Sequence, residues 1–249
     1  FVEFHLSYKD MEVDLDRFFK DRYNLEFTVH CPELFANDHI LDLCSLDESC
    51  RARSIEEVQR VIQVTLKLKK YFKKTKPPLI IINVGGHSQN SPLPVSERQI
   101  LYGLALESLS KLDQEGVELI PQSMPPFPWH FGGQRFQNLF VDATEIADFC
   151  QNNNYRVCLD ISHSKLACNH YKWSFKNFIE SVAPYSAMFH IVDASGVDGE
   201  GLQVGEGEVD FALLGEQLNA LAPNAGFIPE IWQGHKNEGE GFWIALERL

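Results

Sequence analysis

The stretch Val157-Cys158-Leu159-Asp160-Ile161, followed at once by Ser162-His163, indicates the fold class of the chain. Its apolar residues do not alternate with polar ones, as they would in a strand with one exposed face. A short continuous run of this kind is typical of a strand that is buried on both faces in a parallel sheet. The acid near its end and the histidine beyond it carry groups that can bind a metal or transfer a proton.

Six further stretches share this character and are spread along the whole chain. They are Val2–Leu6, Leu25–His30, Leu79–Val84, Val117–Pro121, Ala187–Val192 and Phe227–Trp232. All are rich in β-branched, aliphatic or aromatic residues, and most are continuous in their hydrophobicity. We therefore expect seven strands in a mainly parallel sheet.

Helical patterns lie between these strands. The capping box Ser54-Ile55-Glu56-Glu57 predicts the start of one helix, and Asp142-Ala143-Thr144-Glu145 has the related form for another. Two more apolar stripes with helical spacing are Leu101, Ala105, Leu109 and Leu112, and Phe211, Leu214, Leu218 and Leu221. Strands that alternate with helices over residues 1–249, without a linker or repeat, predict a single α/β domain.

The alternation favours a (β/α)8 TIM barrel, which has eight strands in about 250 residues. Only seven strands are found, and the chain begins directly in one of them. We interpret the first barrel strand as lost ahead of Phe1, and the lack of an initiator Met suggests a piece of a longer chain. A doubly wound sheet is the alternative, but no G-x-G-x-x-G follows the first strand.

Composition excludes several classes of protein. The chain is 44% hydrophobic, 12% aromatic and 23% charged, which is ordinary for a packed globular protein and unlike a disordered or fibrous one. Its 22 basic and 35 acidic residues give a net charge of −13, which argues against a nucleic-acid-binding surface. No apolar window is long enough for a membrane-spanning helix.

The six cysteines form no C-x-x-C pair, so a structural zinc site is not expected. A core of this size needs no disulfides for its stability. We therefore expect free thiols and a cytoplasmic location.

Ligand-type residues stand at the ends of successive strands. In a parallel barrel the functional groups project from the C-terminal strand ends. Gln122, Asp160, His190 and Glu230 occupy four such ends, at intervals of roughly one strand-plus-helix unit, so they should converge on one point. Their oxygen and nitrogen ligands suit Mn²⁺, Mg²⁺, Co²⁺ or Zn²⁺.

Each of these residues also has a structural interpretation. Asp160 and Asp193 could cap the helices that follow them, and His87 could be only a turn residue after Gly85-Gly86. Glu230 is harder to explain in this way. It follows Pro229 in an apolar strand, where burying a carboxylate is costly unless it is paired or binds a metal.

The strand ends resemble the xylose-isomerase-like barrel superfamily, which includes sugar isomerases, sugar epimerases and apurinic-site endonucleases. The matching pieces are His30-Cys31-Pro32-Glu33, Asp160-Ile161-Ser162-His163, His190-Ile191-Val192-Asp193, Val204-Gly205-Glu206-Gly207-Glu208-Val209-Asp210 and Pro229-Glu230. The resemblance implies that Asp160, His190 and Glu230 are metal ligands and that His163 contacts substrate or a further metal.

Two positions depart from the family pattern. Gln122 stands where the family has a metal-binding glutamate, so a fourth ligand remains but a negative charge and a base are lost. The endonucleases also need an Asp-x-His before G-E-G, whereas this chain has Gly199-Glu200-Gly201. The ligands for three zinc ions are therefore absent.

The resemblance predicts a metal-dependent isomerase or epimerase of a sugar or sugar phosphate, acting through an enediolate. Glu230 is the expected base, and His163 or Lys165 is the second proton carrier. The residues expected to bind substrate are His5, His30, His87, Trp129, His163 and His235. Trp129 would be a sugar-stacking platform in a loop, or simply a packed tryptophan.

Two alternatives remain open. A non-catalytic or regulatory sugar-binding barrel of a larger sugar synthase is one, because the first and last strand ends resemble barrel domains attached to sialic-acid-type synthases. A metal-dependent abasic-site endonuclease is the other, and the net charge argues against it. The expected partners are a small-molecule sugar and either other domains of a longer chain or further copies of this one, without nucleic acid or membrane.

Overall fold

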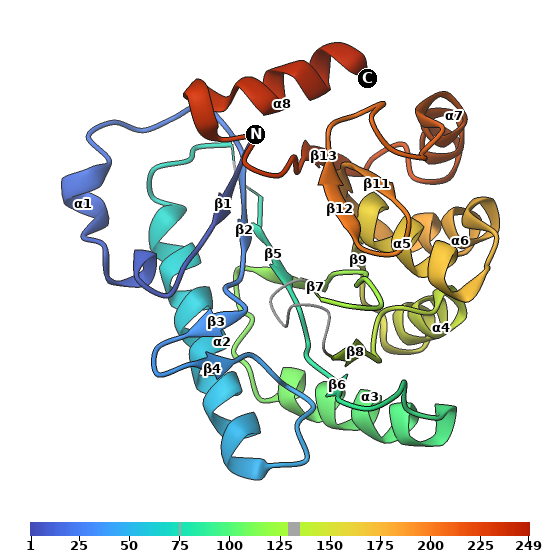
Figure 1. Cartoon of the computed structure of the whole chain (residues 1–249). Coiled ribbons are helices and arrows are strands. Elements are labelled where there is room, and N and C mark those ends of the chain that lie inside the picture. The colour runs from blue at the N-terminus through green and yellow to red at the C-terminus, as the bar shows by residue number, and fades with distance from the viewer. Residues whose placement is uncertain (75, 129–134) are drawn as a thin grey trace. The chain divides into compact units, whose positions relative to one another are not determined.

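The computed structural model describes residues 1–74, 76–128 and 135–249 (Figure 1). The chain divides into two compact units. The first consists of Phe1–Gly86 and Leu93–Pro121, and the second of His87–Pro92 and Gln122–Leu249. All seven strands predicted from the sequence are present, with bounds that differ by no more than a few residues.

The first unit is built on a parallel sheet with the strand order β1-β2-β5-β7. These strands are β1 (Val2–His5), β2 (Phe27–His30), β5 (Leu79–Ile82) and β7 (Glu118–Pro121). Its smaller elements are η1 (Asp10–Glu12), α1 (Leu15–Phe18), β3 (Leu34–Phe35) and β4 (His39–Ile40). The buried residues Ile80, Ile81 and Ile82 show why a continuous apolar run was the correct signal for this sheet.

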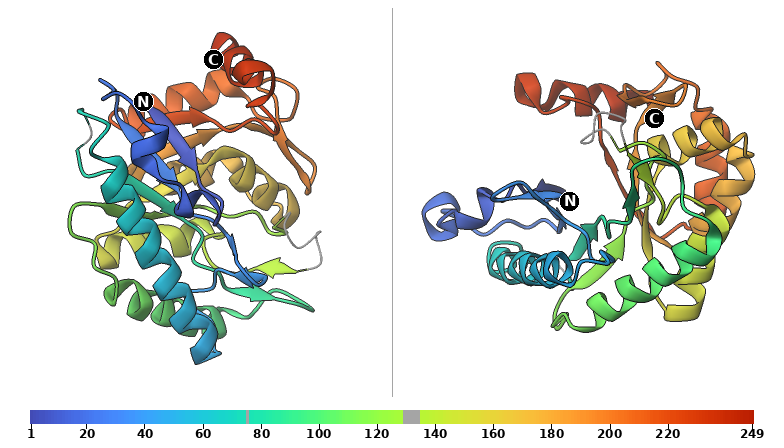
Figure 2. Two further views of the ribbon diagram at one scale, coloured as in Figure 1. Left: turned by 90° about the vertical axis from the view of Figure 1, so that its left-hand side faces the viewer. Right: turned by 60° about the horizontal axis from the view of Figure 1, so that its bottom comes forward.

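Two long helices belong to the first unit, namely α2 (Glu48–Leu68) and α3 (Val95–Ser110), and they contact each other (Figure 2). The predicted helix start at Ser54 is wrong, because α2 begins six residues earlier. The side chain of Asp47 caps it by accepting from the backbone amides of Ser49 and Cys50. Ser54 is instead a buried residue inside α2, and its hydroxyl accepts from the amide of Asp42.

The second unit contains a parallel sheet with the strand order β13-β10-β9. Its strands are β9 (Val157–Asp160), β10 (Ser186–Ile191) and β13 (Gly226–Pro229). Two short antiparallel pairs accompany the sheet. β6 (His87–Ser88) pairs with the distant β8 (Phe136–Gln137), and β11 (Asp193–Ser195) forms a hairpin with β12 (Gly199–Leu202). A single parallel bridge also joins Gln122 to Cys158 of β9.

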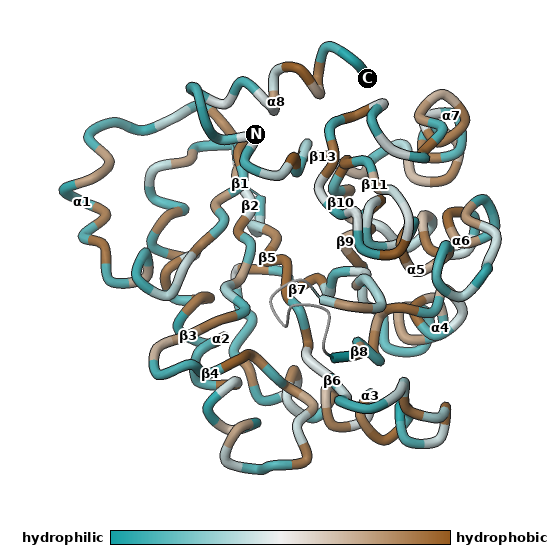
Figure 3. The backbone as a smooth tube through the Cα atoms, viewed as in Figure 1, coloured by the Kyte–Doolittle hydropathy of each residue, from teal (hydrophilic) through white to brown (hydrophobic). Residues whose placement is uncertain are grey.

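The helices of the second unit follow its strands in the predicted alternation. They are α4 (Ala143–Asn153), α5 (Ile161–Tyr171), α6 (Phe175–Val182), η3 (Ala183–Tyr185), α7 (Phe211–Leu221) and α8 (Lys236–Arg248). Asp142 caps α4 as predicted, because its carboxylate accepts from the amides of Thr144 and Glu145. Hydrophobic residues concentrate on strands such as β5, β7 and β9 (Figure 3).

Asp193 has a different structural role from the helix cap considered for it. Its buried carboxylate accepts from the backbone amides of Ala194, Gly205, Gly207 and Val209. A side chain at position 207 would place its Cβ 2.4 Å from an oxygen of Asp193. The segment G-E-G is therefore a loop wrapped around the carboxylate of Asp193. Gly207 is needed there because a side chain would collide with that carboxylate.

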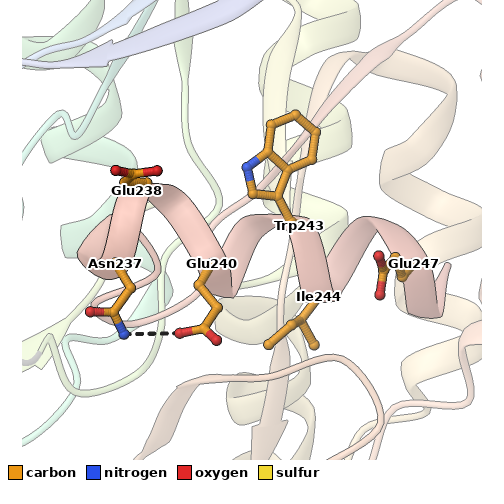
Figure 4. A pocket seen from close by; sticks show the side chains of 6 residues that line it. All are labelled: Asn237, Glu238, Glu240, Trp243, Ile244 and Glu247. Carbon is orange, nitrogen blue, oxygen red and sulfur yellow. Dashed lines mark hydrogen bonds between the residues drawn. The ribbon is translucent and has the colours of Figure 1, made fainter.

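Helix α8 carries a shallow open pocket on its surface (Figure 4). Asn237 donates to Glu240 at 2.9 Å, and Trp243, which also lines the pocket, is 65% exposed. None of the residues that line this pocket is one of the predicted ligands. Within the described ranges, no helix combines the length and hydrophobicity needed to cross a membrane.

Candidate active site

Three ends of the sheet in the second unit bring the predicted metal ligands together. Asp160 is the last residue of β9 and lies opposite His190 of β10 in the parallel register. Glu230 directly follows β13, the other neighbour of β10. One ligand atom from each of these three residues lies within 4.8 Å of the other two.

The position of Asp160 is set by the strand-to-helix junction that it forms. One carboxylate oxygen, Oδ1, accepts from the amide of His163 at 2.8 Å and thereby caps α5. Its own amide donates to the hydroxyl of Ser123 at 2.9 Å, and its carbonyl accepts from the hydroxyl of Ser164 at 2.6 Å. The helix-cap interpretation is thus correct for Oδ1, and Oδ2 remains to face the cluster.

Gln122 joins the cluster through its amide group. The Nε2 atom lies 3.2 Å from Oδ2 of Asp160 and 3.1 Å from Nδ1 of His190. A carboxamide presents its oxygen in place of its nitrogen after a half-turn of the group. The residue is therefore placed where it can be a fourth ligand, and that role stays a prediction.

Glu230 completes the set from a more accessible position. Its Oε2 lies 2.7 Å from Nδ1 of His190, and its side chain is 28% exposed, whereas Asp160 and His190 are fully buried. A carboxylate at the exposed side of a buried cluster can meet a substrate that the deeper residues cannot reach. This position fits the role of base expected for it.

Burial controls the electrostatics of the site. It raises the pKa of Asp160, although the neighbouring His163 acts in the opposite direction. Burial also acts to lower the pKa of His163, but the carboxylates of Asp160 and Glu200 outweigh it and raise that pKa to about 10. Asp160 is buried and Glu230 is partly exposed, and together their carboxylates favour a positive charge at the cluster.

The ring of His163 is fixed at both nitrogens. Its Nδ1 donates to the backbone carbonyl of Ser123 at 2.9 Å, and Nε2 lies 3.1 Å from Oε1 of Glu200. Nδ1 is also 3.6 Å from Oδ2 of Asp160. His163 therefore stands beside the predicted ligands, as expected from the D-x-x-H motif.

Glu200 is a site residue that the sequence did not identify. It lies on β12, and the sequence named it only as part of a segment that lacks the Asp-x-His of the endonucleases. Asp160 and Glu200 are 40 positions apart, and only tertiary folding shows that both meet His163. A lone Glu between two glycines carries no signal that would have found it.

Other predicted residues of this unit lie elsewhere. The ammonium of Lys165 is 3.8 Å from Glu208 and above the ring of Phe175. His87 lies on the short strand β6, opposite Gln137, and His235 is exposed at the start of α8. The described contacts do not bring these three residues to the cluster, and their proposed roles stay predictions.

His5 and His30 belong to the first unit, where they end the neighbouring strands β1 and β2. Their rings stack with centroids 4.4 Å apart, and His5 bonds to Glu3 at 2.8 Å. Their proposed role in substrate binding stays a prediction. Trp129 lies outside the described residues.

The cluster has the donor set of a divalent metal site. Two carboxylates, one imidazole and one amide suit Mn²⁺, Mg²⁺, Co²⁺ or Zn²⁺. At the edge of the cluster lie the partly exposed carboxylate of Glu230 and the ring of His163, which is held by two hydrogen bonds. Such a set can polarise a carbonyl and move a proton from an adjacent carbon.

Comparison with known proteins gives the family context of this site. A family model described as "Xylose isomerase-like TIM barrel" matches residues 1–247. No curated protein matches the chain in sequence. Nothing in these comparisons supports the association with a sialic-acid-type synthase, which stays a prediction.

Solved structures of sugar epimerases resemble the chain in fold. A D-tagatose 3-epimerase-like protein superposes with a TM-score of 0.66 at 19% identity, covering 99% of this chain and 89% of its own. A D-allulose 3-epimerase from Methylomonas sp. gives 0.66 at 13% identity, with 100% and 87% covered. An L-ribulose 3-epimerase gives 0.59 at 16% identity, with 93% and 71% covered.

Proposed function

Because the chain belongs to the xylose isomerase-like TIM barrel family, we propose that it is a metal-dependent sugar isomerase or epimerase. The observation that carries this proposal is the convergence of Asp160, His190 and Glu230 within 4.8 Å at three strand ends. The similarity in fold to 3-epimerases of tagatose, allulose and ribulose type supports a ketose as substrate.

The residues of the second unit suggest how such a reaction would proceed. A divalent metal held by Asp160, His190 and Glu230, with the amide oxygen of Gln122, would supply Lewis acidity toward a carbonyl and a hydroxyl of the sugar. Glu230 removes the proton from the carbon next to the carbonyl, which leaves an enediolate. In an isomerisation Glu230 returns the proton to the neighbouring carbon, whereas an epimerisation needs a second proton carrier on the opposite face, the role expected of His163 or Lys165.

His163 supports these steps through the fixed position of its ring. Its ring is locked between Ser123 and Glu200, so its orientation beside Asp160 is set before substrate arrives. Pre-orientation of this kind lowers the entropic cost of reaching the transition state. Gln122 cannot be a second base because an amide accepts no proton near neutral pH, so a reaction with one base fits this site best.

The metal assignment is tested by the variant Glu230→Ala. Removing one of only two carboxylates should abolish Mn²⁺ binding in titration calorimetry, while the fold, measured by circular dichroism, stays intact. Glu206→Ala is the matched control, because that glutamate is exposed and paired with Arg248 at 2.9 Å. Full metal occupancy in Glu230→Ala would refute the assignment.

The chemistry is tested by isotope exchange. Purified protein with Mn²⁺, Mg²⁺, Co²⁺ or Zn²⁺ should move deuterium from solvent onto the α-carbon of a ketose, and a panel of ketoses and ketose phosphates identifies the class. Exchange must be lost in Glu230→Gln, which keeps the size of the side chain but not its basicity. A protein that binds metal and sugar but exchanges with no member of the panel would contradict the enzymatic proposal.

Gln122 favours one second candidate, a sugar-binding barrel without catalysis. The amide removes the charge and the base that the family glutamate has, and a decayed site would bind metal weakly. In this case the purified protein holds less than about half an equivalent of metal after growth in supplemented medium, and it shows no exchange. An abasic-site endonuclease has no comparable support, and an incision assay on an abasic duplex tests it directly.

A further inference from the structure

Glu200, in the second unit, has no role of its own in the reaction proposed above. It lies at the second position of β12, and its carboxylate is 26% exposed. Oxygen Oε1 meets Nε2 of His163 at 3.1 Å. Among the residues that the structure describes, the other oxygen, Oε2, has no hydrogen-bond partner.

Of the two hydrogen-bond partners of His163, Glu200 is the one that fixes the orientation of the imidazole ring. The bond from Nδ1 to the carbonyl of Ser123 fixes one edge of the ring, but it leaves rotation about that contact possible. The bond from Nε2 to Glu200 removes this freedom. A hydrogen bond to an ionised partner is shorter and about twice as strong as a neutral one.

The pair also matches the chemistry of a sugar hydroxyl. A hydroxyl donates one hydrogen bond and accepts up to two. Both ring nitrogens of His163 are already bonded, to Ser123 and to Glu200, so the partly exposed Oε2 of Glu200 is the acceptor that the pair offers to a hydroxyl. Asp160, one of the proposed ligands, lies 3.6 Å from the other side of the same ring.

We propose that Glu200 is a positioning residue for His163 and that its Oε2 accepts a hydrogen bond from a hydroxyl of the substrate. The inference rests on the proposed sugar chemistry and deepens it. Position 200 thereby contributes a carboxylate to the site that is separate from the charge missing at position 122. Its role is in substrate placement, and the metal ligands do not depend on it.

The variants Glu200→Ala and Glu200→Gln test both parts of this proposal. The glutamine keeps an oxygen for Nε2 of His163 but replaces the second acceptor by an NH₂ group. We therefore expect Glu200→Gln to keep kcat within about threefold and to raise KM by about tenfold or more. Loss of one hydrogen bond between a substrate hydroxyl and a carboxylate weakens binding by about tenfold. Glu200→Ala should lower kcat as well, by about tenfold or more, because a misplaced group commonly costs that much.

A measurement without turnover separates this inference from the proposed function. In ¹⁵N-labelled protein the ring N–H of His163 bonded to a carboxylate should give a protected downfield proton, assigned by its loss in His163→Asn. The signal should persist in Glu200→Gln and disappear in Glu200→Ala. It reports the positioning even if no sugar in the panel exchanges.

The controls define what would overturn the proposal. Mn²⁺ affinity should stay within about twofold in both variants, and Glu206→Gln, on the loop that follows β12, should behave as wild type. Persistence of the ring N–H signal in Glu200→Ala refutes the positioning role. An unchanged KM in Glu200→Gln refutes the hydroxyl contact, and loss of metal in either variant shows that Glu200 acts on the metal site instead.

Discussion

Gln122 is the residue at which the site and the family pattern differ most. Its amide is 2% exposed and touches both Asp160 and His190. A glutamate at this place would add a third carboxylate, whereas the amide leaves the charge of a divalent metal balanced by Asp160 and Glu230. At the proposed metal site, a neutral group at this position would weaken metal binding and leave Glu230 as the base of the proposed reaction.

The variant Gln122→Glu should bind Mn²⁺ roughly tenfold more tightly, a change equal to about 1.4 kcal/mol. A unit charge about 4 Å from another is worth on the order of 4 kcal/mol at an effective dielectric near 20, and desolvation offsets much of this. Titration calorimetry measures the affinity, and Gln151→Glu on the exposed side of α4 controls for added charge. Unchanged affinity would show that position 122 does not face the metal.

Turnover measured on the same variant separates two reasons for the amide. If sugar chemistry is limited by the missing base, Gln122→Glu should increase proton exchange. If the amide instead hydrogen-bonds a substrate hydroxyl, the variant should bind metal more tightly and yet lose turnover. Running the exchange assay beside the calorimetry distinguishes these outcomes.

At the scale of single elements, helix starts decide where the site residues stand. Asp160 ends β9 and caps α5 in consecutive positions, so its strand and helix hold the carboxylate from both sides. Asp142 plays the simpler role of a cap for α4, with no function in the cluster. An aspartate at a helix start thus stabilises the helix in both places, and at Asp160 it is also a candidate metal ligand.

Replacing Asp142 by Ala should lower the free energy of unfolding by about 1 kcal/mol, because two amides of the first turn of α4 lose their acceptor. Urea denaturation followed by circular dichroism measures the change. Asp148→Ala is the control, since Asp148 is an exposed acid on the same helix but not at its start. Equal destabilisation by both variants would mean that lost charge, and not the cap, is responsible.

On the scale of the whole molecule, buried polar groups outside the site make stability depend on pH. His39 is 8% exposed, and its Nε2 lies 3.1 Å from the hydroxyl of Ser54. Burial lowers its pKa from the usual 6.5, with Arg53 acting in the same direction and Glu57 and Asp42 opposing. The unfolded chain therefore binds a proton at this residue more readily than the folded protein does.

The stability contributed by neutral His39 is present above about pH 6.5 and is lost as the pH falls toward the lower folded pKa. The free energy of unfolding should accordingly fall more steeply between pH 7 and pH 5 in the wild type than in His39→Gln. His235→Gln, which changes an exposed histidine, should keep the wild-type slope. Identical slopes in wild type and His39→Gln would contradict this assignment.

Local patterns in the sequence predict the alternation of strands and helices and the strand ends at which functional groups stand. Continuous apolar runs such as Leu79–Ile82 and Val157–Asp160 identify strands without help from their surroundings, because burial on both faces leaves no polar positions. The spacing of Asp160, His190 and Glu230 predicted that these side chains converge, because neighbouring parallel strands end at one edge of the sheet.

Tertiary structure alone decided which side chains become partners across distant parts of the chain. Glu200 reaches His163 only because the hairpin of β11 and β12 folds beside α5, and no local pattern encodes this approach. Helix α2 is capped at Asp47 and not at Ser54. The hydroxyl of Ser54 is buried inside the helix, where it accepts from the amide of Asp42 and lies 3.1 Å from Nε2 of His39, so it cannot cap a helix start. Hydrogen bonds between distant segments depend on packing, which a local sequence pattern does not contain.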